Sequence, residues 1–309
     1  PTSGLGVDGQ EGAVRAAAAN GGTATLRGAT RVRSRAGVTA LPALAATAAL
    51  LAAGVAAGAQ EERGAPAPER PGMAATRAPG AVTPGALPFF EGERLEYRVR
   101  VARLGAIGRV AMRVGERTLV QGVETLPLRF DFEARMGPVR AVDRSASWLD
   151  PRRMRALRFL KHERHLLARH DEQVEIDPAH RRWTAADGTA GTSTNDQPLD
   201  ELSFMYFVRT LPFDGDSAWT FDRHFDPERS PTRVRVAGRR TVSTEAGTFR
   251  TVTLELRVRD PRRYRGEGTI RLDVTDDACR LPVRIESEMP RIGTAVMTLV
   301  AQNHPDAHH

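Results

Sequence analysis

Apolar and charged side chains alternate along the region in which we expect the fold to begin. In the segment 95–101 the odd positions hold Leu, Tyr and Val, and the even positions hold Glu and Arg. The segment 128–135 repeats the pattern, with Leu, Phe and Ala at the even positions and Arg, Asp and Glu at the odd ones. Successive side chains of a strand point to opposite faces of a sheet, so this period of two predicts strands with one buried face.

Similar segments continue almost to the C-terminus and are separated by turn residues. No expected strand is followed by a helix long enough to return the chain to a parallel neighbour, so the strands should pair antiparallel. A sheet of about a dozen strands must curl to cover its apolar face. The expected strands are 95–101, 110–114, 126–135, 139–148, 157–161, 219–225, 232–242, 249–258, 268–274, 281–286 and 292–300, with a further hairpin around residues 177–180.

One segment, Gln197–Pro212, breaks the period of two and predicts an amphipathic helix. Four of its residues are spaced as i, i+3, i+4 and i+7, and further Phe, Val and Leu residues widen the apolar face. These four residues are Leu202, Met205, Tyr206 and Arg209. A face this apolar should be covered by the strands on either side of it in the chain, so the helix is expected to plug the curled sheet.

The ends of this helix have their own signals. Asp196 or Asp200 is expected to cap its N-terminus, and Pro198 to lie in its first turn. Pro212 is expected to end it. The resulting fold class is mainly β, with a large curled antiparallel sheet (a half-barrel or open barrel-like) around one central amphipathic helix.

The N-terminal part of the sequence resembles an export signal. Three arginines at positions 31, 33 and 35 precede an uncharged run, 36–59, which ends in the small residues Ala57-Gly58-Ala59. This layout predicts a cleaved signal peptide at 31–59. A retained N-terminal membrane anchor is the alternative, but the run is mostly Ala and Gly, which insert more weakly than Leu. No cysteine follows the run, so a lipid-anchored form is not supported.

The remaining boundaries follow from composition. Residues 1–30 lack any hydrophobic period and are assigned as a non-native or disordered leader. Residues 60–87 are rich in Pro, Gly and Ala and predict a disordered linker. Residues 88–303 should form a single β-rich domain, and 304–309 a tail. The expected location is the bacterial periplasm, in soluble form after signal cleavage.

The formal net charge of +7 and the pI near 10.6 would suit a nucleic-acid partner. However, Lys161 is the single lysine among 45 basic residues, and the arginines alternate with acids along the chain. A solvated mixed-charge face is therefore favoured over a groove that follows phosphates, and no nucleic-acid partner is expected. The single cysteine, Cys279, excludes an internal disulfide and a cysteine-rich metal site.

Three stretches together resemble a known family. They are Phe89–Tyr97, the helix followed by Arg209–Phe213, and the region from Val274 to Leu299 that contains Arg280–Ile285. In this order they are similar to the bacterial family called domain of unknown function 3108, over about residues 87–303. The resemblance implies an exported, β-rich envelope protein, with no established activity and no catalytic residues to transfer. The curled sheet is also similar in outline to the half-barrels of periplasmic lipoprotein carriers, an analogy of fold alone.

The residues with the best potential for chemistry all have a simpler explanation. His162, His165 and His170 lack the spacing of a helical metal site and are expected on the surface of a polar hairpin. The adjacent Asp276 and Asp277 are typical of a tight turn. No base is identifiable that would activate Cys279. We therefore assign no catalytic, metal or cofactor-binding residue, and no cofactor.

Three functions remain open. The favoured one is a non-enzymatic binding or scaffolding module, with an apolar or lipid-like ligand between the helix and the curled sheet. One alternative is an envelope hydrolase acting on cell-wall or polysaccharide material, which would need carboxylates or a nucleophile–base pair in one cleft. The other is an assembly protein, with an envelope component as partner and an exposed apolar patch in place of a pocket.

Overall fold

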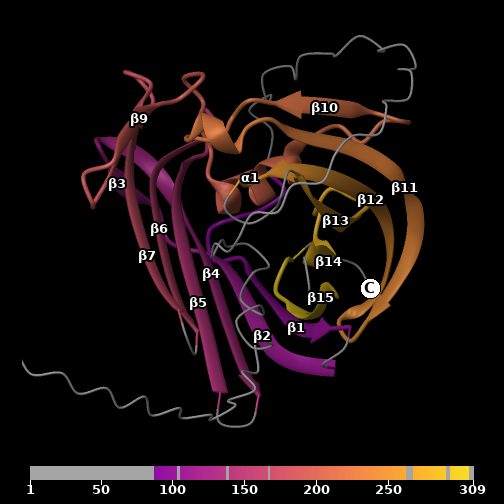
Figure 1. Ribbon diagram of the computed structural model, residues 1–309. Helices are drawn as coiled ribbons and strands as arrows, with labels where there is room; N and C mark the ends of the chain where they lie inside the picture. Colours follow the sequence, from indigo (N-terminus) through magenta and orange to yellow (C-terminus); the bar gives the residue numbers. More distant parts are fainter. Residues whose placement is uncertain are drawn as a thin grey trace, which may run out of the picture. The chain divides into compact units, whose positions relative to one another are not determined.

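The computed structural model describes residues 87–102, 105–136, 139–165, 168–261, 267–289 and 293–305. Within them the chain forms one large antiparallel sheet and a single short α-helix, which confirms the predicted fold class. Figure 1 shows α1 between strands β4–β7 on one side and β11–β15 on the other. The predicted leader (1–30), the signal peptide (31–59), almost all of the linker and most of the tail lie outside the described residues.

The elements follow the chain in an uninterrupted run of strands up to the helix, and again after it. They are β1 (Arg94–Val101), β2 (Gly105–Val114), β3 (Thr118–Val120), β4 (Val123–Met136), β5 (Val139–Asp150), β6 (Arg155–His165), β7 (Ala168–Asp177), β8 (Arg182–Ala185), β9 (Ala190–Thr192), α1 (Glu201–Phe207), the 3-10 helix η1 (Val208–Thr210), β10 (Ala218–Phe221), the 3-10 helix η2 (Pro227–Arg229), β11 (Thr232–Thr244), β12 (Gly247–Arg259), β13 (Glu267–Thr275), β14 (Pro282–Met289) and β15 (Gly293–Gln302).

The first and last strands are neighbours in the middle of the sheet. The strand order is β10-β11-β12-β13-β14-β15-β1-β2-β4-β5-β6-β7-β8-β9, and β3 pairs only with β4. Strands β1 to β9 thus form one half of the sheet, running from its centre to one edge. After α1, strands β10 to β15 form the other half, running from the opposite edge back to the centre. We call these halves the two wings of the sheet. Among the described strands β9 and β10 do not pair, so the sheet is not closed into a barrel.

The helix is shorter than the sequence predicts. It begins at Glu201 because Asp200 caps it, accepting hydrogen bonds from the backbone of Leu202 and Ser203 at 2.9 Å each. The expected first-turn residue Pro198 precedes the cap, because Leu199 is extended and forms a parallel bridge with His224. The last residues tighten into η1, and Leu211 is extended before Pro212. Of the two expected caps, Asp200 is the one that the structure confirms, whereas the predicted helix length of 16 residues was wrong.

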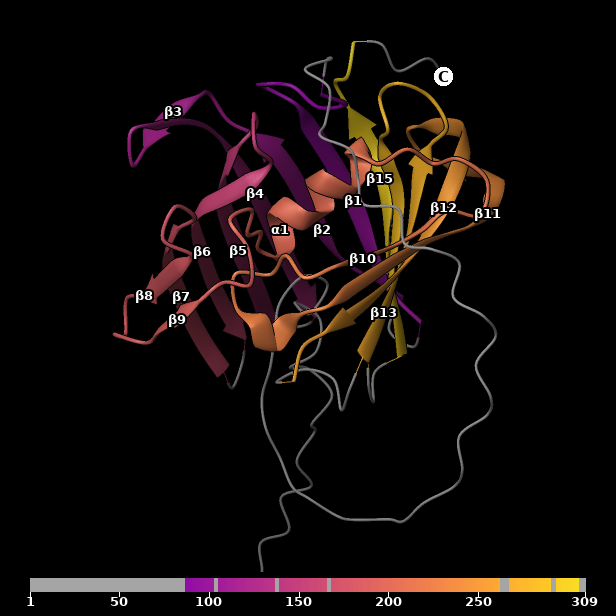
Figure 2. The same ribbon diagram turned by 90° about the horizontal axis from the view of Figure 1, so that it is seen from above.

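Every residue of α1 after Glu201 is buried, together with Val208 and Arg209 of η1. Except for Ser203 and Arg209, they join a single hydrophobic cluster that runs from Phe89 before β1 to Leu299 in β15. Figure 2 shows α1 lying across the space between the two wings of the sheet. The helix therefore plugs the curled sheet, as the sequence predicts.

Most expected strands are present and longer than predicted. The segment 157–161 belongs to β6, Arg155–His165, and the segment 249–258 to β12, Gly247–Arg259. The expected strand 219–225 was too long, since β10 ends at Phe221. The chain then leaves the sheet, and its backbone pairs with Leu199: Phe225 N–H donates to the Leu199 carbonyl, and Leu199 N–H donates to the carbonyl of Arg223. No helix among the described residues is long and apolar enough to cross a membrane.

Candidate functional site

A cavity of about 80 Å³ lies between the first turns of α1 and strands β11–β13. Its apolar surface comes from the helix and from inward-facing positions of β12 and β13. Its polar surface comes from the helix N-terminus, from the connection between β10 and β11, and from the end of β12. The lining residues are Leu199, Asp200, Glu201, Phe204, Met205, His224, Arg229, Thr232, Leu256, Val258, Arg259, Asp260 and Ile270.

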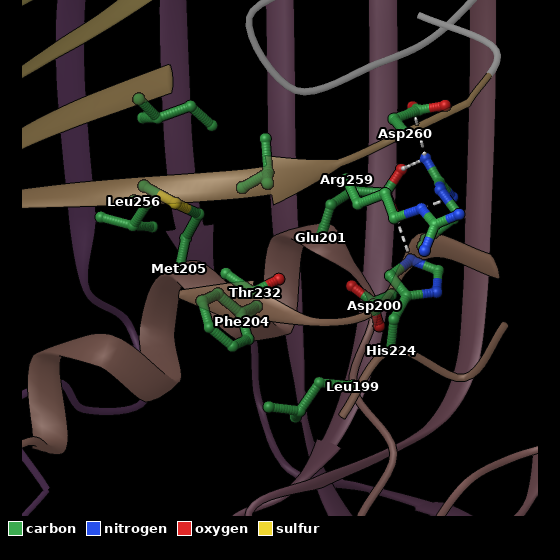
Figure 3. Close-up of a pocket in the computed structure, with 13 residues that line it drawn as sticks. Leu199, Asp200, Glu201, Phe204, Met205, His224, Thr232, Leu256, Arg259 and Asp260 are labelled. Atoms are coloured by element: carbon green, nitrogen blue, oxygen red, sulfur yellow. Dashed lines mark hydrogen bonds and ion pairs between the residues drawn. The ribbon is translucent and has the colours of Figure 1, made fainter. Parts of the chain in front are cut away.

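The two kinds of surface are segregated. Figure 3 shows Met205 and Leu256 at one end of the pocket, and Glu201, His224 and Asp260 at the other. Met205 and Leu256 are buried, while Val258 is half-buried beside them. The pocket is therefore amphipathic along its length.

Glu201 is the centre of the polar end. Its Oε1 lies 3.3 Å from Nζ of Lys161 and 3.3 Å from Nη2 of Arg229. Its Oε2 lies 3.4 Å from Nε2 of His224. Arg229 in turn contacts Asp260, with Nη2 3.1 Å from Oδ2. One carboxylate thus links the helix to β6 and to the segment between β10 and β11.

These contacts fix the charge of each group. Burial alone would raise the pKa of Glu201, but Arg229, Lys161 and His224 outweigh it and hold that pKa well below its usual range. Burial and the Arg229 guanidinium lower the pKa of His224, so the imidazole is neutral at pH 7. Its Nδ1 accepts a hydrogen bond from the backbone of Asp226 at 3.0 Å, which places its proton on Nε2, facing Glu201.

Asp200 is adjacent to Glu201 but has the opposite electrostatic character. It is completely buried, and burial raises its pKa to about 7, although Ser147 and Ser203 donate hydrogen bonds to it. The hydroxyl of Ser147 lies 2.6 Å from Oδ2, while Oδ1 caps the helix. Both oxygens are therefore occupied by the fold itself.

A second layer of charge lies behind Glu201, on the inner face of β5 and β6. Lys161 is fully buried, 3.7 Å from Oε1 of Glu163. Asp143 stands directly opposite Glu163 across the two strands. Burial raises the pKa of Asp143 to about 7, with Lys161 opposing the rise and Glu163 adding to it. The only lysine of the chain thus supports an inward-facing cluster of acids.

The three stretches that carry the family resemblance meet at a different place, around Arg209 of η1. Its guanidinium pairs with both oxygens of Glu93, at 2.8 and 2.9 Å. It also donates to the backbone oxygens of Arg280, at 3.0 Å, and Cys279, at 3.1 Å. Burial alone would lower the pKa of Arg209, but Glu93 outweighs it and raises that pKa.

Aromatic residues complete this buried cluster. Phe89 and Tyr206 pack edge to face with ring centroids 5.1 Å apart, and the guanidinium of Arg209 lies over both rings. Tyr97 donates its hydroxyl proton to the backbone oxygen of Pro282 at 2.8 Å. Arg209 and Glu93 are almost inaccessible to solvent, so this cluster offers no surface to a ligand. Its role is to join segments that are distant in the sequence.

The structure separates the histidines that the sequence places close together. His162 lies on the outer face of the sheet and contacts Asp171. His170 is on the inner face, where its Nε2 lies 3.5 Å from Glu172, and this carboxylate raises the pKa of His170. The side chain of His165 lies outside the described residues. No group of three metal-binding side chains occurs among the residues that the structure describes.

The other sequence candidates have structural roles. Asp277 accepts hydrogen bonds from Thr275 Oγ1 and from the backbone of Cys279 and Arg280, at 2.7, 3.0 and 3.2 Å, and so shapes its turn. Cys279 is buried beneath that turn. Asp277 is exposed, but its carboxylate is engaged by the turn, and Cys279 is inaccessible.

The polar end of the pocket was missed by the sequence reasoning. His224 and Arg229 come from the connection between β10 and β11, Asp260 follows β12, and no motif connects them. The one available signal was the acidic pair Asp200-Glu201 at the start of a helix that is otherwise almost entirely apolar.

Chemically, the pocket suits binding better than hydrolysis. Three carboxyl groups and an imidazole converge in it, as the hydrolase alternative would require. However, Asp200 caps the helix, while Glu201 and Asp260 are held by Arg229. Arg259, by contrast, is exposed and forms no hydrogen bond or ion pair with the described residues. It is the charged group of the lining most available to a ligand.

Three solved structures resemble the chain at low identity. A β-barrel-like protein of domain of unknown function 1849 from Brucella abortus is 12% identical, with a TM-score of 0.44, over 69% of this chain and 97% of that one. A candidate exported protein with a YmcC-like fold from Bacteroides fragilis is 13% identical, with a TM-score of 0.29, over 70% and 97%. A candidate lipoprotein from Parabacteroides distasonis is 9% identical, with a TM-score of 0.26, over 69% and 96%.

No curated protein matches the sequence. A family model does, over residues 96–300, which span every strand from β1 to β15 as well as α1. The match includes Arg209 and the carbonyl groups of Cys279 and Arg280 that it contacts, and it covers well over half of the chain. The chain therefore belongs to the family described as protein of unknown function DUF3108.

Proposed function

We propose that the chain is an exported, non-enzymatic binding protein whose ligand inserts a short apolar segment between α1 and β12, beside an anionic group near Arg259. The observation that carries the proposal is the amphipathic cavity of about 80 Å³ under the helix. Export rests on the signal-peptide pattern at residues 31–59.

The size of the cavity limits the ligand. A water molecule needs about 10–15 Å³ of cavity volume, so the space holds roughly six groups of that size. Pockets for whole drug-sized ligands are about 300–1,000 Å³. The cavity therefore suits the end of one alkyl chain, and the remainder of a longer lipid would stay outside.

The chemistry of the lining defines the rest of the ligand. Burying about four methylene groups against Met205 and Leu256 contributes roughly 3 kcal/mol. The exposed guanidinium of Arg259 adds attraction for a carboxylate or a phosphate. Arg229 contributes less, because Glu201 and Asp260 already neutralise it. The expected affinity is in the millimolar to micromolar range.

Calorimetric titration of the whole chain tests this proposal. Octanoate and octyl phosphate serve as charged probes, and octyl glucoside as an uncharged one. Val258→Phe fills the mouth of the cavity and should weaken all three probes by about tenfold, a loss of about 1.4 kcal/mol. The matched control is Val123→Phe, which changes a half-buried valine of β4 that does not line the cavity.

A second pair of variants examines the charged group. Arg259→Gln should weaken octanoate and octyl phosphate by about tenfold and leave octyl glucoside within about twofold. Arg257→Gln removes the same charge from the same strand, outside the cavity, and should change neither. The proposal fails if no probe saturates at millimolar concentration, or if both valine variants lose affinity equally.

A further inference from the structure

The outer face of the sheet places arginine opposite arginine. Arg98 of β1 is the cross-strand partner of Arg109 of β2. Farther along the same strands, Arg94 stands opposite Arg113, which in turn stands opposite Arg129 of β4. Like charges directly opposite one another destabilise a sheet. Acids lie between the arginines on β1 and β4, but at the paired positions above positive charges stand directly opposite one another.

These arginines line a continuous hollow on that face. Two adjoining grooves, of about 540 and 750 Å³, share Arg98, Arg109 and Glu133. Seven arginines and four acids line the pair. They are Arg94, Arg98, Arg109, Arg113, Arg135, Arg140 and Arg144, with Glu96, Asp131, Glu133 and Glu245.

The four acids do not neutralise all of these arginines. Glu245 pairs with Arg98, and Glu133 pairs with Arg140. Arg109, where the two grooves adjoin, and Arg135, at the end of β4, are exposed, and their side chains have no hydrogen bond or ion pair with the part of the chain that the structure describes. A surplus of positive charge thus lies in a concave surface, where the field of the guanidinium groups is concentrated.

We propose that this arginine groove binds a linear polyanion whose repeating units carry phosphate or carboxylate groups. Guanidinium groups form paired hydrogen bonds with both of these anions. The groove crosses β1, β2, β4 and β5, a width of about 14 Å at roughly 4.8 Å per strand, which accommodates several repeats of an extended polymer. Neutralisation by the polymer would relieve the repulsion between the opposed arginines.

Two features distinguish this site from others. The arginines occupy the strand positions that alternate with the buried ones, so the groove is on the opposite face of the sheet from α1 and its cavity. The groove also lacks an aromatic platform, because its lining aromatics, Tyr97 and Phe132, are buried. Single-stranded nucleic acids bind largely by stacking bases on exposed aromatic rings, so a polymer without bases fits better.

The test uses the whole chain and three fluorescently labelled polymers, namely long-chain polyphosphate, polygalacturonate and a single-stranded oligonucleotide. Inorganic phosphate serves as the monomeric control. Binding is followed by anisotropy at low and moderate salt. Arg98→Gln combined with Arg109→Gln should weaken the preferred polymer by at least about tenfold, and added salt should weaken binding further because these charges are exposed.

The control variant is Arg152→Gln combined with Arg153→Gln, which removes two exposed charges from the turn after β5. It should stay within about twofold of the unchanged chain, since two charges outside the groove add only a screened attraction. Preference for polyphosphate or for polygalacturonate supports the groove and identifies its anion. Equal losses in the two double variants, tighter binding of the oligonucleotide, or equally tight binding of free phosphate would each overturn the proposal.

Discussion

Asp143 and Glu163 face one another across β5 and β6, and Lys161 is the cation between them and Glu201. Such an arrangement is stable only while the positive charge remains, because buried carboxylates without a partner are strongly destabilising. One oxygen of Asp143 has no hydrogen-bond partner among the described residues. This carboxyl group is therefore the least well-compensated member of the cluster, and its pKa of about 7 reflects that.

The raised pKa of Asp143 predicts a pH-dependent stability. The folded chain keeps this carboxyl protonated between about pH 4 and pH 7, whereas the unfolded chain does not, so its contribution to stability falls as the pH rises and levels off above about pH 7. Asp143→Asn removes the titration and should stabilise the chain by roughly 2–4 kcal/mol at pH 8, with little effect at pH 4. Urea unfolding at both pH values measures this difference.

Asp200 titrates in the same window, because its pKa is also about 7. Asp143→Asn should therefore remove only part of the slope of stability against pH. A surface control, Asp222→Asn, should leave the slope unchanged. A slope in Asp143→Asn as steep as in the unchanged chain would show that the Asp143 carboxyl does not titrate as proposed.

The helix α1 has seven residues and could not persist alone, since isolated helices shorter than about 12 residues are marginal in water. Its stability comes from the side chains it buries and from the cap at its N-terminus. Asp200 and Ser203 form a reciprocal capping box, and Ser147 of β5 anchors the cap to the sheet. The cap therefore positions the helix as well as ending it.

Substitution of the cap should separate these effects. Asp200→Ala removes the acceptor for two backbone N–H groups and for the Ser147 hydroxyl, and should lower the free energy of unfolding by about 1–3 kcal/mol. Asp200→Asn keeps an acceptor at the cap and should recover most of that loss. Chemical unfolding at pH 6 measures both variants, and equal loss in the two would contradict a capping role.

Most of the strands can be predicted from the alternation of apolar and polar residues and from the turn residues between them. Apolar and polar side chains must alternate along a strand wherever one face of the sheet is buried. The length of α1 was not predictable in the same way. Leu199 is as apolar as the helical residues, and only its bridge with His224 makes it extended, whereas Leu211 is extended because it precedes Pro212. The rows of arginine across β1, β2 and β4 depend on register, which alternation within a single strand does not reveal.

Across the whole molecule, Arg209 connects parts of the chain that lie far apart in sequence. It holds the segment before β1, the end of the helical region and the turn between β13 and β14 in one buried contact. The sequence marks these three stretches only as a family pattern. It does not show that they meet, because their proximity depends on the complete strand order. The pocket escaped prediction for the same reason.

Loss of this contact should affect the whole domain. Arg209→Leu leaves Glu93 buried without its cation and should lower the free energy of unfolding by about 3–5 kcal/mol. Because one hydrophobic cluster spans the strands, unfolding should remain a single transition. Calorimetry provides both quantities, with Arg153→Leu as an exposed control. Two separate transitions, in the variant or in the unchanged chain, would contradict the predicted single domain.

The neighbouring positions of β1 and β15 have a kinetic consequence. Leu95 pairs with Gln302, so the centre of the sheet cannot form until β15 is available. Contacts this distant in sequence slow folding, because a long loop must close before it is stabilised. In a ribosome-bound or partly translocated chain that lacks β15, β1 can pair with β2 alone, and the sheet stays incomplete. For a protein that we propose to be exported, this late pairing postpones completion of the sheet until β15 is released.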